Sequence, residues 1–190
     1  FTPLTAVAAL LGLAGLVLVG DGLYMQAKAK LAQVLLDRAF AAAIVAGGPV
    51  KAWSWADTWP VARIEITRIG ARAIVLEGAS GEALAFGPAH VAGTPRPGEP
   101  GTAVYAAHRD THFDFLKDVV AGDDIAVTRA DGARFDFRIV ATRVARFDNS
   151  DIDAHAPGRR LVLSTCWPLD AKTPGPMRYL VEAELIEPGR

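Results

Sequence analysis

The sequence predicts a mostly β protein: a closed or nearly closed β-barrel that follows a single apolar helix. Residues 4–19 are an uncharged run of Leu, Val, Ala, Gly and one Thr, which indicates the helix. Beyond residue 60, short segments that alternate apolar and polar residues recur between turns rich in Gly, Pro and Asp. Two of these segments end in chemically reactive side chains, His108 and Cys166. No repeat, low-complexity tail or domain break interrupts the chain after residue 60.

Length, charge and cysteine content narrow the class of protein. The chain has 190 residues, enough for one domain with an appendage and a substantial core. Its formal net charge of −1 gives no indication of nucleic-acid binding. The single cysteine excludes an intrachain disulfide and leaves one free thiol, which is a liability in an oxidising compartment unless it has a function.

The first segment has three interpretations. We expect residues 1–22 to be a transmembrane signal anchor, because a helix of about 17–25 residues spans a bilayer and the apolar run continues into a helical pattern without a break. A cleaved signal peptide is the alternative, with Ala27-Lys28-Ala29 resembling a cleavage site. A buried core helix fits this hydrophobicity less well. Lys28 and Lys30 argue weakly for the wrong orientation if the remainder of the chain lies outside the cytoplasm.

Residues 23–50 are expected to be a helical connector. Leu31, Val34, Leu35 and Ala42 predict its apolar stripe, and Gly47-Gly48-Pro49 ends the helix. Three tryptophans follow at positions 53, 55 and 59. We expect them to pack against the core and not at lipid headgroups.

The pattern in the rest of the chain predicts strands. Asp131-Gly132 is a strong hairpin signal, and residues 87–101, rich in Gly and Pro, predict a long ordered loop. The predicted strands are residues 61–66, 71–76, 102–107, 125–129, 133–140, 161–166 and 177–186. In residues 61–66, the alternation places Ala62, Ile64 and Ile66 inward.

One strand end brings together a thiol and a cation. Residues 161–166 alternate, and Pro168 prevents further pairing, so the strand stops near Cys166. If residues 177–186 pair with it antiparallel, Arg178 becomes the neighbour of Cys166 on the polar face. A positive field activates a thiol, and a guanidinium stabilises an oxyanion. A small buried cysteine beside a solvated arginine is the alternative.

The four histidines do not indicate a metal site. His108 ends a predicted strand, whereas His112 lies four residues later without the helical glutamate motif of a zinc pair. His90 suits a structural role and His155 a solvated one. We therefore expect no metal and no cofactor.

Together these strand ends resemble the sortases, which are cysteine transpeptidases of bacterial surfaces. The segment Val162-Leu163-Ser164-Thr165-Cys166, followed by Arg178, is similar to their signature Thr-Leu-x-Thr-Cys with a following arginine. Ala106-Ala107-His108 is similar to their strand-end histidine, although Val162 and Ala107 depart from the usual Thr and Gly. The narrower resemblance is to the Gram-negative class GN sortases. It covers residues 53–63, 75–81, 108–113 and 165–170 together with Arg178-Tyr179.

The resemblance implies a fold and a reaction. Residues 51–190 would form a sortase-like closed β-barrel of about eight strands with short helices. Cys166 would attack a C-terminal sorting signal to form a thioester acyl-enzyme, with His108 exchanging protons and Arg178 holding the carbonyl oxygen. Thr165 and Trp167 would contribute to substrate binding, although Trp167 also suits packing. Asp110 and Asp170 either orient the reactive groups or are simply solvated.

The resemblance also implies partners and a location. The partners would be a protein with a sorting signal, an amine acceptor, and the inner membrane, with the catalytic domain in the periplasm. An L,D-transpeptidase or a papain-like peptidase would place its cysteine in a different local context. The alternatives that stay open are a periplasmic β-barrel binding module with an incidental cysteine, and a cysteine peptidase that only hydrolyses.

Overall fold

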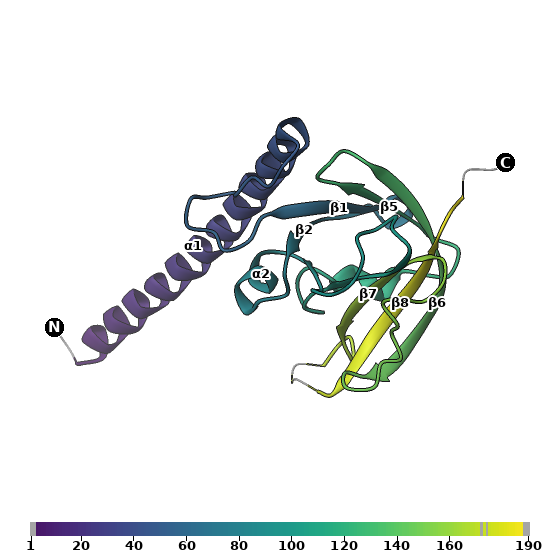
Figure 1. The fold of residues 1–190 in the computed structure, drawn as a ribbon. Helices are drawn as coiled ribbons and strands as arrows, with labels where there is room; N and C mark the ends of the chain where they lie inside the picture. The colour runs from purple at the N-terminus through teal and green to yellow at the C-terminus, as the bar shows by residue number, and fades with distance from the viewer. Residues whose placement is uncertain (1–2, 172, 174, 188–190) are drawn as a thin grey trace.

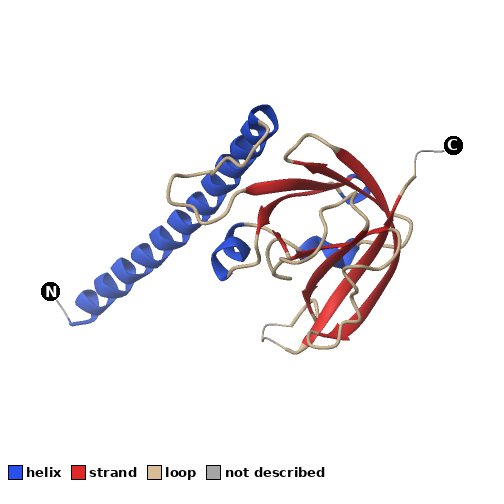
Figure 2. Ribbon diagram, in the orientation of Figure 1, coloured by secondary structure: helices blue, strands red, loops and turns tan. Residues whose placement is uncertain are grey.

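The computed structural model describes residues 3–171, 173 and 175–187. A long helix projects beside a closed barrel of eight strands (Figure 1), and short helices occupy the connections between strands (Figure 2). The elements in chain order are α1 (Pro3–Ala46), β1 (Pro60–Ile66), η1 (Thr67–Ile69), β2 (Ala71–Glu77), α2 (Gly81–Phe86), β3 (Ala89–His90), β4 (Gly101–Ala106), η2 (Asp114–Asp118), β5 (Asp124–Arg129), β6 (Arg134–Arg146), β7 (Arg159–Cys166) and β8 (Met177–Leu185).

The strands close in the order β1-β2-β3-β4-β7-β8-β6-β5. Most neighbours are antiparallel, but β2 and β3 pair in parallel, as do β4 and β7, which are far apart in the sequence. Because β4 and β7 run in the same direction, the segments after them leave the barrel at the same edge. The order also places β7 halfway round the barrel from β1.

Strand alternation fills the interior as the sequence predicts. Ala62, Ile64 and Ile66 are each 1% exposed, whereas the intervening Arg63 and Glu65 are only partly buried. The predicted Asp131-Gly132 hairpin is confirmed: it joins β5 to β6, with Gly132 at φ 84°. A positive φ is the conformation that glycine adopts without steric cost.

Helix α1 docks on the barrel through a different stripe from the predicted one. Its buried residues are Ala32, Leu36, Ala39, Phe40 and Ala43, whereas Leu31, Val34 and Ala42 of the predicted stripe are exposed. The prediction was wrong because apolar residues occur on every side of this helix, so periodicity did not select one face. The docking face instead uses alanines, whose small side chains allow the helix to approach the barrel closely.

The N-terminal half of α1 extends away from the barrel (Figure 1). The described part of the helix is long and apolar enough to cross a membrane, and none of its most apolar window is buried. Its other half is fixed by the buried stripe and by Gln33, whose Nε2 donates to the Phe86 carbonyl at 2.7 Å.

Three other predictions were wrong in part. The loop predicted at residues 87–101 contains the short strand β3, whose two residues carry too little pattern to be detected. Strand β6 continues to Arg146, beyond the predicted end at residue 140. Trp53 packs edge-to-face on Phe86 as expected, with ring centroids 4.9 Å apart, but Trp55 is 78% exposed.

Candidate active site

Cys166 and Arg178 are direct partners across the antiparallel β7–β8 ladder. Opposed residues in such a ladder have Cβ atoms about 4.5–5.5 Å apart and share one face of the sheet. The pairing predicted from the sequence is therefore confirmed. Strand β7 ends at Cys166, where Trp167 still donates to the Met177 carbonyl at 3.0 Å before Pro168 turns the chain away.

His108 comes to the same level from the other side of β7. In the parallel ladder Ala106 lies opposite Ser164, and the Ala107 amide donates to the Ser164 carbonyl at 3.1 Å. If this register is extended by two residues beyond the end of β4, His108 lies beside Cys166. The buried Thr165 hydroxyl donates to the Ala107 carbonyl at 2.8 Å and so joins the two strand ends.

The alternation of side chains along each strand places Cys166, His108 and Arg178 on the outer surface of the barrel. Leu161, Leu163 and Tyr105 point into the main core, so the intervening positions on β4, β7 and β8 face outward. This part of the outer face is nonetheless apolar, because Val104, Val162 and Leu180 are buried together beneath Ile152 and other neighbours. These three residues form an apolar floor. His108 is exposed and Cys166 partly exposed at the end of this floor.

Among the described residues, main-chain carbonyls and not a carboxylate hold the Arg178 guanidinium. Its Nη1 donates to the Gly175 and Met177 carbonyls at 2.9 Å each, and its Cζ lies 5.6 Å from the ring centroid of Phe147. Its Nε and Nη2 form no hydrogen bond with any residue that the structure describes. These N–H groups are therefore open to a ligand oxygen.

Arg109 is a site residue that the sequence did not reveal. It is 8% exposed, and its Nη2 donates to the Thr173 carbonyl at 2.7 Å. It thus ties the segment after His108 to the loop that joins β7 to β8. Its Nη1 is buried without a hydrogen-bond partner among the described residues. In the sequence it looks like any loop arginine, and only burial distinguishes it.

The residues predicted to bind substrate lie close to Cys166. The Thr165 side chain is 1% exposed and engaged with Ala107, so in this conformation only its main chain is available to a ligand. The Trp167 ring stacks on Tyr179 with centroids 5.7 Å apart, which agrees with a packing role and leaves the rest of its surface at the site. Asp110 and Asp170 are exposed, and neither bonds to His108 or Arg178 within the described chain.

The other histidines have separate environments. His90 is buried, with Nε2 donating to the Pro95 carbonyl at 3.0 Å, and His155 is exposed, as expected. His112 donates from Nε2 to the Ala85 carbonyl at 3.3 Å, and its partial burial lowers its pKa. Over the described residues, no three His, Cys, Asp or Glu side chains gather as metal ligands.

A polar groove of about 350 Å³ continues along the outer face of β7 and β8. It begins at Val162, four residues before Cys166, and lies under residues 151–156. Arg143 crosses it: its Nε donates to Glu182 at 2.6 Å and its Nη2 to the Ser150 carbonyl at 2.6 Å. The segment between β6 and β7 is thereby fixed over the face that leads to the cysteine.

The fold and these strand ends match known proteins. A profile of the sortase domain matches residues 64–186. Sortase D of Bacillus subtilis is 30% identical over 124 residues, which cover 65% of this chain and 62% of that protein. The structure of sortase A from Corynebacterium diphtheriae superposes with a TM-score of 0.62 at 27% identity, covering 71% of this chain and 64% of that one.

A Clostridium perfringens structure described as a sortase D5 transpeptidase gives a TM-score of 0.59 at 27% identity, covering 67% of this chain and 79% of that one. The described structure is a closed eight-stranded barrel that carries a thiol, an imidazole and a guanidinium at or just beyond adjacent strand ends. This chain belongs to the sortase family. It spans less than two thirds of the Bacillus and Corynebacterium relatives.

Proposed function

We propose that this protein is a sortase-type transpeptidase that cleaves a C-terminal sorting signal and transfers the acyl part to an amine. The observation that supports this most is the register of three adjacent strands. It places Cys166 opposite Arg178, and the β4–β7 register, extended by two residues beyond Ala106 and Ser164, would bring His108 to the same level. Family membership adds that sortases are cysteine transpeptidases.

The first half of the proposed reaction forms an acyl-enzyme. His108 takes the thiol proton, and the Cys166 sulfur attacks the carbonyl carbon of the signal, so a C–S bond forms as the carbonyl becomes an oxyanion. Arg178 donates to that oxyanion through its open N–H groups. The C–N bond then breaks, and the leaving amine takes the proton held by His108.

The second half reverses these steps with another amine. The incoming amine gives a proton to His108 and attacks the thioester carbonyl. The C–S bond breaks, and the thiolate recovers the proton from His108. Water in place of the amine would give hydrolysis. The exposure of His108 suits this exchange, because both amines must reach it from solvent.

The sorting signal is proposed to lie along the outer face of β7 and β8. Val104, Val162 and Leu180 offer an apolar floor near Cys166, and the groove beneath residues 151–156 offers both charges of the Arg143–Glu182 pair. Trp167 would border the end of this proposed binding face. No cofactor is invoked in the proposal.

The proposed sortase subclass, domain organisation and cellular location rest on the sequence motifs and on the apolar helix. The motifs at residues 53–63, 75–81 and 108–113 favour the class GN sortases. Residues 1–22 would anchor the chain in the inner membrane, and residues 23–50 would form a helical connector to the catalytic barrel. Residues 51–190 would form that barrel in the periplasm. The helix supports anchoring by its length and apolar surface.

The test is a transfer assay with the full chain, a labelled library of LPxTG-like peptides and a small amine. We expect a peptide–amine product with wild type and none with Cys166→Ala. Shortened peptide without an amine adduct, formed even at high amine concentration, would identify a hydrolase. Failure of every peptide, while Cys166 still reacts with an alkylating reagent and the barrel stays folded, would favour a binding module.

A further inference from the structure

A second and larger groove lies between α1 and the barrel, away from the path proposed for the signal. Its volume is about 690 Å³, within the range of small-molecule sites. Its walls come from α1, from the start of β2, from α2 and from the segment after His108. Met25, Phe86 and Phe115 give it an apolar lining.

Cations border this apolar groove. Lys28 and Lys30 line it from α1 and Arg72 lines it from β2, against a single carboxylate, Asp114. Arg72 is already paired with Asp37. Neither lysine forms an ion pair with any carboxylate in the described part of the chain. The groove therefore combines an apolar interior with two uncompensated positive charges at its border.

The groove lies where the helix would leave a membrane. The uncharged run ends at Val19 and Asp21 follows, so a membrane span of about 20 residues that includes this run would end near residues 20–23. Tyr24 comes next and is 63% exposed, as suits an aromatic residue at headgroup level. Lys28 is five residues beyond Leu23, about 7 Å further along the axis. In Figure 1, α2 lies in the angle between the barrel and the projecting half of α1.

We propose that this groove binds an anionic membrane phospholipid. Its phosphate would bind at the cationic border that Lys28 and Lys30 give the groove, and the start of its acyl chains would lie against Met25, Phe86 and Phe115. The proposal rests on the proposed membrane anchoring, but not on the transfer reaction. A neutral lipid would leave both lysines uncompensated, whereas an anionic lipid matches their charge and the apolar wall together.

A bound lipid would also give Lys28 and Lys30 a role, whereas the orientation of the helix in the membrane does not account for them. Lysines just beyond an anchor favour a cytoplasmic location for the domain on that side of the helix, yet the proposed barrel is periplasmic. Binding an anionic headgroup gives Lys28 and Lys30 a role independent of orientation. The lipid would also fix the catalytic barrel against the membrane, because the groove wall includes Thr111 and His112, which lie shortly after His108.

The experiment measures lipid retention by the full chain carrying Cys166→Ala, so its result is independent of catalysis. The protein is purified in a non-ionic detergent, mixed with equal amounts of phosphatidylglycerol and phosphatidylcholine, and analysed by native mass spectrometry. We expect preferential retention of phosphatidylglycerol. Lys28→Gln with Lys30→Gln should reduce that preference by about fivefold for each lysine removed.

The matched control removes the same charge elsewhere. Arg38 and Lys51 are exposed and do not line the groove, so Arg38→Gln with Lys51→Gln should leave the preference unchanged. Ala29→Trp should fill the groove and reduce retention of both lipids. Equal retention of the two lipids, retention of neither, or an equal loss in the control variant would overturn the proposal. The transfer assay would be unaffected by any of these outcomes.

Discussion

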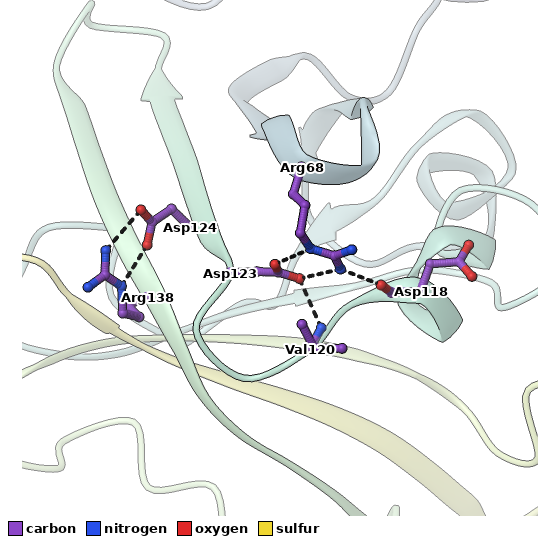
Figure 3. Close-up of polar contacts among 6 residues, drawn as sticks. All are labelled: Arg68, Asp118, Val120, Asp123, Asp124 and Arg138. Atoms are coloured by element: carbon purple, nitrogen blue, oxygen red, sulfur yellow. Dashed lines mark hydrogen bonds and ion pairs between the residues drawn. The ribbon is translucent and has the colours of Figure 1, made fainter.

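Arginines around strand β5 are paired with carboxylates, whereas Arg178 at the reactive strand ends contacts main-chain carbonyls. Arg68 binds both oxygens of Asp123 and the Asp118 carbonyl, and Arg138 binds both oxygens of Asp124 (Figure 3). At the start of β8, by contrast, Arg178 donates to the Gly175 and Met177 carbonyls.

The two regions differ in whether the positive charge of the arginine is compensated by a carboxylate. A carboxylate neutralises the guanidinium that it binds and fixes both side chains in one geometry. Carbonyl oxygens orient a guanidinium but leave its full charge in place. The region around β5 therefore uses arginine in ion pairs between elements of the barrel, whereas the strand end at Arg178 retains a positive charge that the proposed reaction would use to stabilise its oxyanion.

The largest effect expected from this contrast comes from substitution of Arg178. Arg178→Ala should lower kcat for peptide transfer by about 10²–10³-fold, the usual loss when an oxyanion donor is removed. Arg178→Lys should recover part of this, since charge returns without the planar set of donors. Transfer kinetics with thermal unfolding as a fold check would measure both.

Arg138→Ala is the matched control, because it removes an arginine from the carboxylate-paired region. It should change kcat less than about twofold, as expected for a surface ion pair remote from the chemistry. An equal loss of activity in the two variants would remove the distinction between the two regions.

A smaller effect is expected at Arg109. Arg109→Met should loosen the loop between Cys166 and Arg178, because the bond to the Thr173 carbonyl is lost. Misplacement of reacting groups lowers the rate of the chemical step, so we expect kcat to fall about tenfold with KM little changed. Partial rescue by Arg109→Lys would support positioning by a donor. A change confined to thermal stability would show a structural role alone.

The smallest effect concerns stability and leaves activity unchanged. Asp123 is 5% exposed, and the hydrogen bond from Arg68 lowers its pKa, aided by the Val120 amide and opposed by burial. An aspartate in the unfolded chain has a pKa of about 3.9. The stabilisation is therefore complete above about pH 4 and is lost as pH falls through the lowered folded pKa.

Asp123→Asn should cost about 1–2 kcal/mol near pH 7, since Arg68 stays half exposed and is not left buried without a partner. The difference from wild type should shrink on acidification below pH 4, as denaturant unfolding at several pH values would show. Asp124→Asn is the control. Its pair with Arg138 is half exposed on both sides, so its cost should be much smaller.

The sequence predicted most of the barrel because alternation is a local signal. The pairing of Cys166 with Arg178 came from two alternating runs and the proline-rich loop between them. The parallel neighbourhood of β4 and β7 was not predicted from alternation, since the residues that it joins lie far apart in the sequence. Resemblance of the motifs around His108 supplied that link.

Other features depended on burial at positions where no local pattern indicates it. Arg109 carries no sequence signal that distinguishes it from other loop arginines, yet it is buried, and Trp55 was predicted to pack but is exposed. The docking stripe of α1 was missed because apolar residues occur on every side of the helix. These three cases share one cause: tertiary contacts select among faces or residues that the sequence leaves equivalent.

The proposed role of Cys166 as the nucleophile, assisted by Arg178, can be tested by intact-mass spectrometry of a trapped acyl-enzyme. A cleavable peptide is added without an amine, and the reaction is quenched in acid before peptide mapping. We expect one adduct, on the peptide that contains Cys166, released by hydroxylamine, absent in Cys166→Ala and much reduced in Arg178→Ala. Peptide turnover without an adduct on Cys166, or an adduct on another residue, would show that Cys166 is not the nucleophile.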